Sequence, residues 1–394
     1  MHFELSDELK ALVHVAREFA DDKIRPFVDE WEKQHYFPYR EVVKPMAELG
    51  FLGTVIPEEY GGNDMGWVAT MIVTEEIARA CSSLRVQINM EMVGCAFPIL
   101  RYGSDALKRA YIPKLVNGEY LGGFAITEAT AGSDVVAMRS HAEDRGDHWL
   151  LNGAKGWISN ANIADVVIYY AHTEGAGRGA SGAGRGKSLS AFVLPLKNTA
   201  GVITEEWDKL GAYLSPTGGI TLEDVRIPKD HILGQPGDGA GIVFGSLNQT
   251  RLQAAAGAVG LAQACLDEVT KYCNEREQFG QKIGQFQMNQ DLVAQMVTEI
   301  EAARLLVYKA AWQKDQGNLG NTLEVAQAKY FAGEVVNRAA NYAMRILGAY
   351  GYSTEYPVAR FYRDTPTYFM VEGSANICKM IIALDQLGYR KANR

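Results

Sequence analysis

The first third of the chain carries apolar residues at helical spacing. The segment LKALVHVAREFA places Leu9, Leu12, Val13, Ala16 and Phe19 on one stripe, and MIVTEEIARA repeats that spacing. Residues three and four apart share a helix face, so amphipathic helices are predicted from about residue 5 to residue 117. Ser6, directly before the first stripe, is predicted to cap the first helix.

The pattern changes between about residues 121 and 233. Short alternating or β-branched runs are separated there by Gly, Asn, Asp and Pro: HWLLNG, ADVVIYYAHT, SLSAFVLPL and GGITLEDVRIP. Such runs between turn residues predict strands. After GQPGDGAG the period is helical again, over about 242–277, 288–316, 323–349 and 374–387.

The order of helices, strands and helices, without βαβ alternation, argues against a Rossmann fold and predicts an α+β multidomain protein. The 394 residues, 47% of them apolar, suffice for several cores. We expect an N-terminal helical domain over residues 1–120, a middle β domain over 121–235 and a C-terminal helical domain over 236–394.

Charge and composition exclude several classes of protein. The net charge of -8 provides no positive field for nucleic acid or an anionic membrane surface, so local arginines must bind any anionic ligand. No apolar run reaches the roughly 18 to 20 residues of a membrane span, and MHFELSDELK lacks a signal pattern, so we expect a cytoplasmic location. Five scattered cysteines without a C-x-x-C pair are predicted to be buried apolar residues.

Two other kinds of site find no support. The run GAGRGASGAGRGKS, residues 175–188, ends like a phosphate-binding loop, but Ser181 stands where the first glycine of that motif belongs and a strand pattern follows, so we interpret it as a flexible hairpin loop. The seven histidines are scattered and none belongs to an H-E-x-x-H motif. No metal is expected.

Four stretches interrupt their structured surroundings: FAITEATAGSD, KGWISNA, REQFG and FMVEGSANICK. Thr127, Gly132 and Ser133 offer hydroxyl and backbone groups for a ring or phosphate, Trp157 offers a stacking face and Arg276 a cation. For each stretch alone, composition favours the alternative of a turn, a core tryptophan or a solvated arginine.

Glu372 follows an apolar run and precedes Gly373. A carboxylate in such a setting suits a general base, and a surface glutamate at a helix start is the alternative.

Together and in this order, these stretches resemble the acyl-CoA dehydrogenase family over nearly the whole chain. ITEATAGSD is similar to its first signature, with Ala129 in place of the usual proline. TRLQAAAGAVGLAQACLDEVTKYCNEREQFGQKI, RILGAYGYSTEYPVARFYRD and VEGSANI resemble its substrate helix, flavin loop and C-terminal signature. The resemblance implies an N-terminal helical domain, a middle β-barrel domain and a C-terminal four-helix bundle, assembled as a homotetramer with FAD bound.

The resemblance also implies roles for individual residues. Those implied to bind FAD, partly across a subunit interface, are Phe124, Ile126, Thr127, Gly132, Ser133, Trp157, Ile158, Ser159, Arg276, Phe279, Gln287, Arg345, Ala349, Ser374 and Asn376. Those implied to contact the acyl-CoA substrate are Arg85, Ser133, Leu247, Asn248, Arg251 and Gly373.

The implied reaction is α,β-dehydrogenation of an acyl-CoA thioester, with electrons passed to an electron-transfer flavoprotein. Glu372 falls at the position of the base in most of the family. Some members carry the base one residue before the arginine of the substrate helix, but Thr250 stands there in this chain, so Glu372 has no rival carboxylate.

Within the family, the sequence is most similar to the glutaryl-CoA dehydrogenases. Arg85 aligns with the arginine that holds the distal carboxylate of the substrate in that subfamily. A buried guanidinium needs an anionic partner, so a dicarboxylic substrate would explain it. The alternative is an ion pair within the protein, for instance with Glu75 or Glu91.

Three departures leave the outcome of the reaction open. Decarboxylating glutaryl enzymes carry a tyrosine, a serine and a glutamate where this chain has Val371, Asn89 and Ala78. The product is therefore glutaconyl-CoA or, after decarboxylation, crotonyl-CoA. A bulkier carboxylated, aryl or alicyclic thioester, such as benzylsuccinyl-CoA or cyclohexanecarboxyl-CoA, is an alternative, since the small residues Val371, Ala78 and Gly94 would widen the pocket. An inactive acyl-CoA-binding scaffold is the alternative without catalysis.

Overall fold

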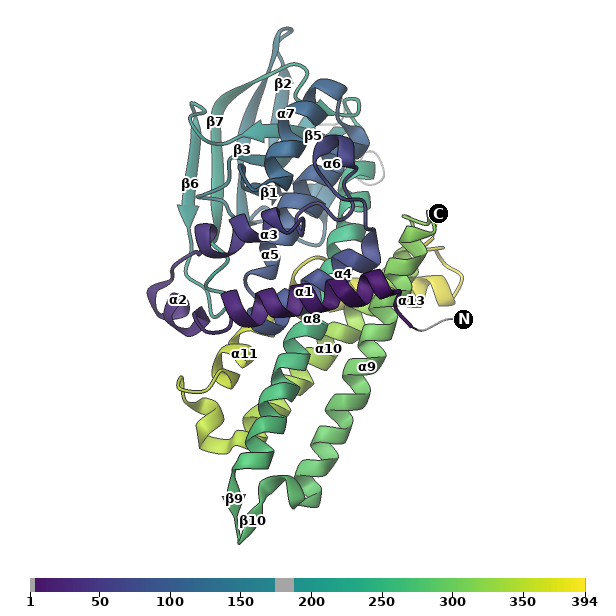
Figure 1. Ribbon diagram of the computed structural model, residues 1–394. Helices are drawn as coiled ribbons and strands as arrows, with labels where there is room; N and C mark the ends of the chain where they lie inside the picture. The colour runs from purple at the N-terminus through teal and green to yellow at the C-terminus, as the bar shows by residue number, and fades with distance from the viewer. Residues whose placement is uncertain (1–3, 174–187, 394) are drawn as a thin grey trace.

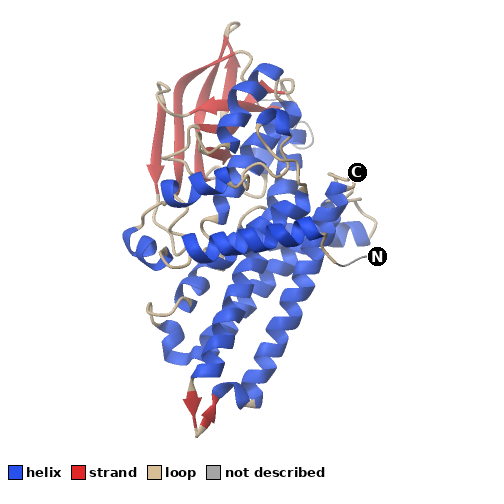
Figure 2. Ribbon diagram, in the orientation of Figure 1, coloured by secondary structure: helices blue, strands red, loops and turns tan. Residues whose placement is uncertain are grey.

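The computed structural model describes residues 4–173 and 188–393. The large β-sheet lies at one end of the molecule and the long helices extend to the other, with the first helix of the chain across the junction (Figures 1 and 2). This confirms the predicted helix, strand, helix order. The Gly-rich run of residues 175–188 lies, apart from its last residue, outside the described residues.

The N-terminal part is helical, as predicted. Ser6 caps its first helix, since the Ser6 hydroxyl accepts a hydrogen bond from the Leu9 N–H at 3.3 Å. The α-helices are α1 (Asp7–Lys23), α2 (Val28–Gln34), α3 (Lys44–Glu48), α4 (Trp67–Ala80), α5 (Arg85–Ile88), α6 (Phe97–Tyr102) and α7 (Asp105–Val116).

A π-helical stretch, η3 (Asn89–Ala96), joins α5 to α6 without a break. A second, shorter π-helical stretch, η1 (Tyr39–Val43), precedes α3. π-Helical turns are uncommon and often occur at functional sites. The stretch after Arg85 therefore directs attention to Asn89, its first residue.

Eight strands form one sheet in the order β6-β7-β3-β2-β4-β5-β8, and β1 pairs with β4. The β1–β4 and β2–β4 pairs are parallel and the others antiparallel. A separate core, which includes Trp149, Tyr169 and Phe192, lies among these strands. The strands are β1 (Gly122–Ala125), β2 (His141–Asp144), β3 (His148–Ser159), β4 (Val166–Thr173), β5 (Leu189–Pro195), β6 (Val202–Glu206), β7 (Thr217–Pro228) and β8 (Ile232–Leu233).

Three long helices, α8 (Gly239–Glu275), α9 (Gln287–Asp315) and α10 (Thr322–Leu347), run side by side away from the sheet (Figure 1). A short hairpin of β9 (Glu277–Gln278) and β10 (Gln281–Lys282) links α8 to α9 at the far end. The fourth helix, α13 (Ala375–Gln386), packs on α10. Two short helices, α11 (Val358–Asp364) and α12 (Thr367–Met370), were not predicted, because one or two turns are too short to show a period.

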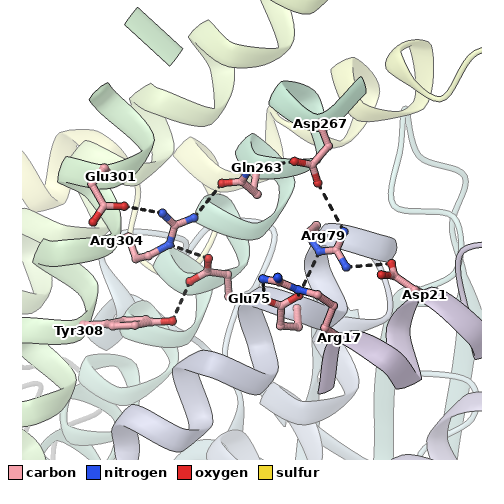
Figure 3. A network of polar contacts seen from close by, with 10 residues as sticks. Arg17, Asp21, Glu75, Arg79, Gln263, Asp267, Glu301, Arg304 and Tyr308 are labelled. Atoms are coloured by element: carbon pink, nitrogen blue, oxygen red, sulfur yellow. Dashed lines mark hydrogen bonds and ion pairs between the residues drawn. The ribbon is translucent and has the colours of Figure 1, made fainter. Parts of the chain in front are cut away.

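A network of ion pairs fastens the N-terminal helices to the bundle (Figure 3). Arg79 on α4 donates to Asp21 on α1 at 2.8 Å and lies 3.4 Å from Asp267 on α8. Arg304 on α9 donates to Glu75 on α4 at 2.8 Å. Arg79 and Glu75 are buried, so loss of a partner would leave a charge uncompensated, and the network fixes α4 against α8 and α9.

The core is continuous from the N-terminal helices to the bundle. All five cysteines are buried and free, as predicted. Among residues 4–173 and 188–393, no helix is both long and apolar enough to cross a membrane.

Candidate active site

A large cleft of about 1460 Å³ has walls from all three parts of the chain. It gathers most of the predicted site residues: Arg85, Phe124, Ile126, Thr127, Gly132, Ser133, Trp157, Ile158, Ser159, Leu247, Asn248, Arg251, Glu372, Gly373 and Ser374. Asn376 borders a smaller pocket beside Ser374. The other predicted residues lie elsewhere: Arg276, Phe279, Gln287, Arg345 and Ala349.

Glu372 lies in the tight connection between α12 and α13. Its φ is 57° and that of Gly373 is 84°, so two successive residues are in the left-handed region. A non-glycine residue in this region costs roughly 1–3 kcal/mol and is held there by its surroundings. Such strain is commonly found at functional sites.

Two side chains from different helices hold the Glu372 carboxylate. The Asn89 amide donates from Nδ2 to Oε1 at 3.1 Å. The Thr250 hydroxyl donates to Oε2 at 2.5 Å. Both carboxylate oxygens are therefore engaged, and the side chain is oriented before any substrate binds. Sequence reasoning treated both positions only as departures from family patterns and missed these contacts.

Arg251 holds the backbone beneath the same carboxylate. Its Nε donates to the Glu372 carbonyl oxygen at 3.1 Å. Burial lowers the pKa of the Arg251 guanidinium. A Cβ at Gly373 would lie 2.5 Å from Arg251 Nε, so both this contact and the positive φ require glycine at that position.

Arg85 lies in the cleft without a carboxylate partner among the described residues. Its exposed fraction is 4%, and its Nε has no hydrogen-bond partner. The predicted alternative of an internal ion pair is wrong. Glu75 binds Arg304 and the Tyr308 hydroxyl, and Glu91 accepts from the Gly122 N–H.

The strand side of the cleft offers an aromatic face and several hydroxyl groups. The Trp157 side chain is 62% exposed, at a φ of 61°, and packs edge-on against Trp207 at 5.3 Å between ring centroids. Thr127, Ser133 and Ser159 line the same cleft. An exposed indole beside hydroxyl donors fits a planar heteroaromatic ring such as the isoalloxazine of FAD.

A buried ion pair, not predicted from sequence, holds this wall. Lys155 Nζ lies 2.8 Å from Glu128 Oε1 and donates to the Ile126 carbonyl oxygen at 3.2 Å. Glu128 also accepts from the Ser140 hydroxyl at 2.6 Å. These contacts lower the pKa of Glu128, although burial opposes them, and burial lowers the pKa of Lys155 to about 8. Both groups are therefore charged at neutral pH, and the pair fixes the loop that follows β1.

The remaining predicted FAD residues lie at the far end of the bundle (Figure 1). Arg276 directly follows α8 and stacks over Tyr350 at 5.7 Å, and Phe279 is 95% exposed. Twenty-five residues of helix separate Arg251 from Arg276, which corresponds to about 37 Å. One chain therefore does not bring both groups to one ligand.

One wall of the cleft was missed in the sequence. α13 contributes Ile377, Met380, Ile381 and Leu384, a stripe that begins one turn after Glu372, and the following segment contributes Arg390, Lys391 and Ala392. The segment is held in place: the Ala392 N–H donates to Asp385 and the Asn393 side chain accepts from the Leu323 N–H, both at 2.8 Å. An amphipathic period over 377–384 was the available signal, but it did not distinguish cleft from core.

Comparisons with known proteins identify the family. Three models match consecutively: the N-terminal domain of acyl-CoA dehydrogenase over residues 6–119, the middle domain over 123–225 and the C-terminal domain over 237–387. The chain belongs to the acyl-CoA dehydrogenase family. It is therefore an FAD-dependent oxidoreductase that acts on acyl-CoA thioesters.

Individual relatives and solved structures show which members of the family this chain resembles. Glutaryl-CoA dehydrogenase of Desulfococcus multivorans is 67% identical over 396 residues, covering 100% of both chains. The structure of a glutaryl-CoA dehydrogenase in complex with glutaryl-CoA superposes with a TM-score of 0.97 at 66% identity, covering 100% of this chain and 98% of the other. A chain in a structure of the electron transferring flavoprotein of Acidaminococcus fermentans matches with a TM-score of 0.93 at 33% identity, covering 98% and 100%.

Proposed function

We propose that this chain catalyses the FAD-dependent α,β-dehydrogenation of glutaryl-CoA, with Glu372 as the base. The observation that carries the substrate is Arg85, a buried guanidinium without a carboxylate partner in the cleft that also holds Glu372. A guanidinium in this state is costly unless an anion pairs with it, and the distal carboxylate of glutaryl-CoA is such an anion. The similarity to glutaryl-CoA dehydrogenases supports the same substrate.

In this proposal the chain's own residues orient the substrate and move the proton. Glu372, held by Asn89 and Thr250, accepts the α-proton of the thioester. The Glu372 backbone N–H donates to the thioester carbonyl oxygen, where negative charge develops. Bound FAD supplies the acceptor for the β-hydride. Val371 and the apolar stripe of α13 exclude water from the reacting atoms.

The cofactor is proposed to lie against the strand wall, with Trp157 and Ser159 on one side and Thr127 and Ser133 on the other. Phe124, Ile126, Gly132 and Ile158 border the same space, and Ser374 and Asn376 complete it. Because Arg276, Phe279, Gln287, Arg345 and Ala349 lie at the far end of the bundle, we propose that they serve the FAD of a second copy. A homotetramer supplies such an arrangement.

An electron-transfer flavoprotein is proposed as the electron acceptor, in keeping with the neighbour from a structure of such a protein. A cytoplasmic location is proposed with it.

The residues around Glu372 bear on the product. Asn89 donates to Glu372, and Val371 has no polar group, so neither provides the hydroxyl that the decarboxylating pattern has at its position. The product is proposed to be glutaconyl-CoA, and crotonyl-CoA would show decarboxylation.

The structure removes part of the argument for a bulkier acyl group. Val371 lines the cleft, but Ala78 packs between α4 and α8, where its Cβ lies 2.9 Å from the position of a Cβ on Gly260. The prediction that Ala78 widens the pocket is therefore wrong. Gly94, in contrast, lies against Asn89 and Phe124, and these two residues line the cleft.

The deciding experiment is anaerobic bleaching of the bound flavin by glutaryl-CoA and, separately, by butyryl-CoA. We expect faster bleaching at lower concentration with glutaryl-CoA and loss of that preference in Arg85→Met. Mass analysis of the product with an artificial acceptor separates glutaconyl-CoA from crotonyl-CoA. Equal bleaching by both thioesters in the unaltered protein would contradict the proposed substrate, and bleaching by neither would direct the search to aryl or alicyclic thioesters.

A further inference from the structure

Arg85 is surrounded by residues from α8, from α12 and from the turn between α4 and α5. Its guanidinium carbon lies 5.2 Å from the centroid of the Tyr368 ring, on α12. Ser82 precedes it by one turn, and Gly257 lies opposite it on α8. We refer to Ser82, Gly257 and Tyr368 as the Arg85 cradle.

Tyr368 is fixed at both ends. Its side chain is fully buried, and its hydroxyl forms a hydrogen bond with the Ser82 hydroxyl at 2.8 Å. Its backbone oxygen accepts a hydrogen bond from Lys329 Nζ, on α10, at 2.6 Å. Burial raises the pKa of the Tyr368 hydroxyl, so this group remains a neutral phenol beside the guanidinium. A ring held in this way offers its π-face to a cation without reorganisation.

Gly257 supplies the space that the Arg85 side chain needs. A Cβ at this position would lie 2.9 Å from both Cδ and Nε of Arg85 and 3.0 Å from the Tyr368 hydroxyl. Glycine within a helix is less stable than alanine, so its presence in the middle of α8 calls for a local reason. The close approach of Arg85 to the helix backbone is that reason.

The charges around the cleft show what the cradle leaves open. Arg85, Arg251 and Lys329 are buried cations, and the negative charge of Glu372 acts on both Arg251 and Lys329. Asn89 and Thr250 already bind both oxygens of that carboxylate. Arg85 is therefore held in one orientation, with a free Nε and no carboxylate partner among the described residues.

We propose that Tyr368 and Gly257 are specificity-determining positioning residues. Tyr368 orients the guanidinium by its ring face and hydroxyl, and Gly257 lets it lie close against α8, so that its donors meet a carboxylate at the end of the acyl chain. This inference rests on the proposed function and adds that selectivity for a carboxylated acyl group depends on residues that do not touch the reacting atoms. An arginine without this cradle would adopt other rotamers and lose its discrimination.

The test uses the FAD-loaded full chain and steady-state kinetics with glutaryl-CoA and butyryl-CoA. For Tyr368→Phe, which keeps the ring and removes the hydroxyl, we expect the KM for glutaryl-CoA to rise about 10-fold. For Gly257→Ala, which displaces Arg85, we expect a rise of about 10- to 100-fold. With butyryl-CoA both variants should stay within about 2-fold of the unaltered protein in KM and kcat, because it presents no carboxylate.

A double-mutant cycle shows whether the effect passes through Arg85. In an Arg85→Met background, Tyr368→Phe should no longer change the ratio of the two KM values. Tyr308→Phe is the matched control, since it removes the buried hydroxyl that donates to Glu75 outside the cleft (Figure 3). It should leave the ratio unchanged.

The outcomes separate this inference from the proposed function. If Arg85→Met abolishes the preference for glutaryl-CoA but Tyr368→Phe and Gly257→Ala retain it, the cradle is refuted and the substrate stands. An equal effect of Tyr368→Phe on both thioesters would make the tyrosine merely structural and refute the inference. If the unaltered protein shows no preference, both the substrate and the cradle are refuted. Thermal melting and FAD content confirm that each variant is folded.

Discussion

The Thr250 hydroxyl donates to Glu372 Oε2 at 2.5 Å, across 122 residues of sequence. Thr250 stands where some members of the family carry their base. In this chain it orients the carboxylate on the opposite side of the cleft, and Asn89 orients the same group from the π-helical stretch. The geometry of the proposed base is thus set by residues that cannot themselves accept the proton.

Replacement of the proposed base is the most direct prediction. Glu372→Gln should keep FAD bound and lower the rate of flavin bleaching by about 10²- to 10⁴-fold, because the amide cannot accept the α-proton. Glu372→Asp, which keeps the charge on a shorter side chain, should retain more activity. Stopped-flow absorbance under anaerobic conditions measures both, and bleaching of the Gln variant at an unaltered rate would indicate a different base.

The donors to Glu372 should matter through geometry. We expect Thr250→Val to lower kcat by about 10- to 100-fold, because a small displacement of the reacting group is costly. Thr70→Val is the control, since Thr70 is equally buried and shares a hydrogen bond with Thr54 away from the cleft. An unchanged kcat in Thr250→Val would show that Asn89 alone suffices to orient the carboxylate.

The segment after α13 should anchor the phosphates of CoA. Arg390 and Lys391 line the cleft beyond an apolar stripe that extends from residue 377 to residue 384. The double variant Arg390→Ser/Lys391→Ser should raise the KM for glutaryl-CoA about 3- to 10-fold and weaken its dependence on salt, with kcat unchanged. The control Lys33→Ser removes an exposed charge on α2, away from the cleft, and should leave the KM unchanged. If the double variant has the same KM as this control, the CoA phosphates bind elsewhere.

The buried Lys329 predicts a pH-dependent stability. Burial lowers its pKa from 10.5 to about 8. Between these values the unfolded chain binds more protons than the native chain, so stability rises with pH across this range, by at most about 3 kcal/mol. Lys329→Met lacks this contribution. Between pH 7 and pH 10 the melting temperature of the unaltered chain should therefore rise relative to that of the variant. A difference that stays constant over this range would refute the lowered pKa of Lys329.

The sequence by itself determined the class of fold and the order of its elements. Long periodic stretches and strand runs bounded by turn residues are local properties, so α8, α9 and α10 and strands β4, β5 and β7 were found within a few residues, and β3 in its first half. Short elements such as α11 and α12 were missed, since a single turn carries no period. The signature stretches also identified the family, and most of the site residues that the resemblance implied line the cleft.

Only the tertiary structure decided which polar groups are partnered. From the sequence alone, Glu75 or Glu91 could have paired with Arg85. In the fold both carboxylates accept hydrogen bonds from other donors. The contacts of Glu372 with Asn89 and Thr250 join three segments far apart in the chain. Hydrogen bonds and ion pairs depend on distances of a few ångströms, which local pattern does not encode and which the packing of helices fixes.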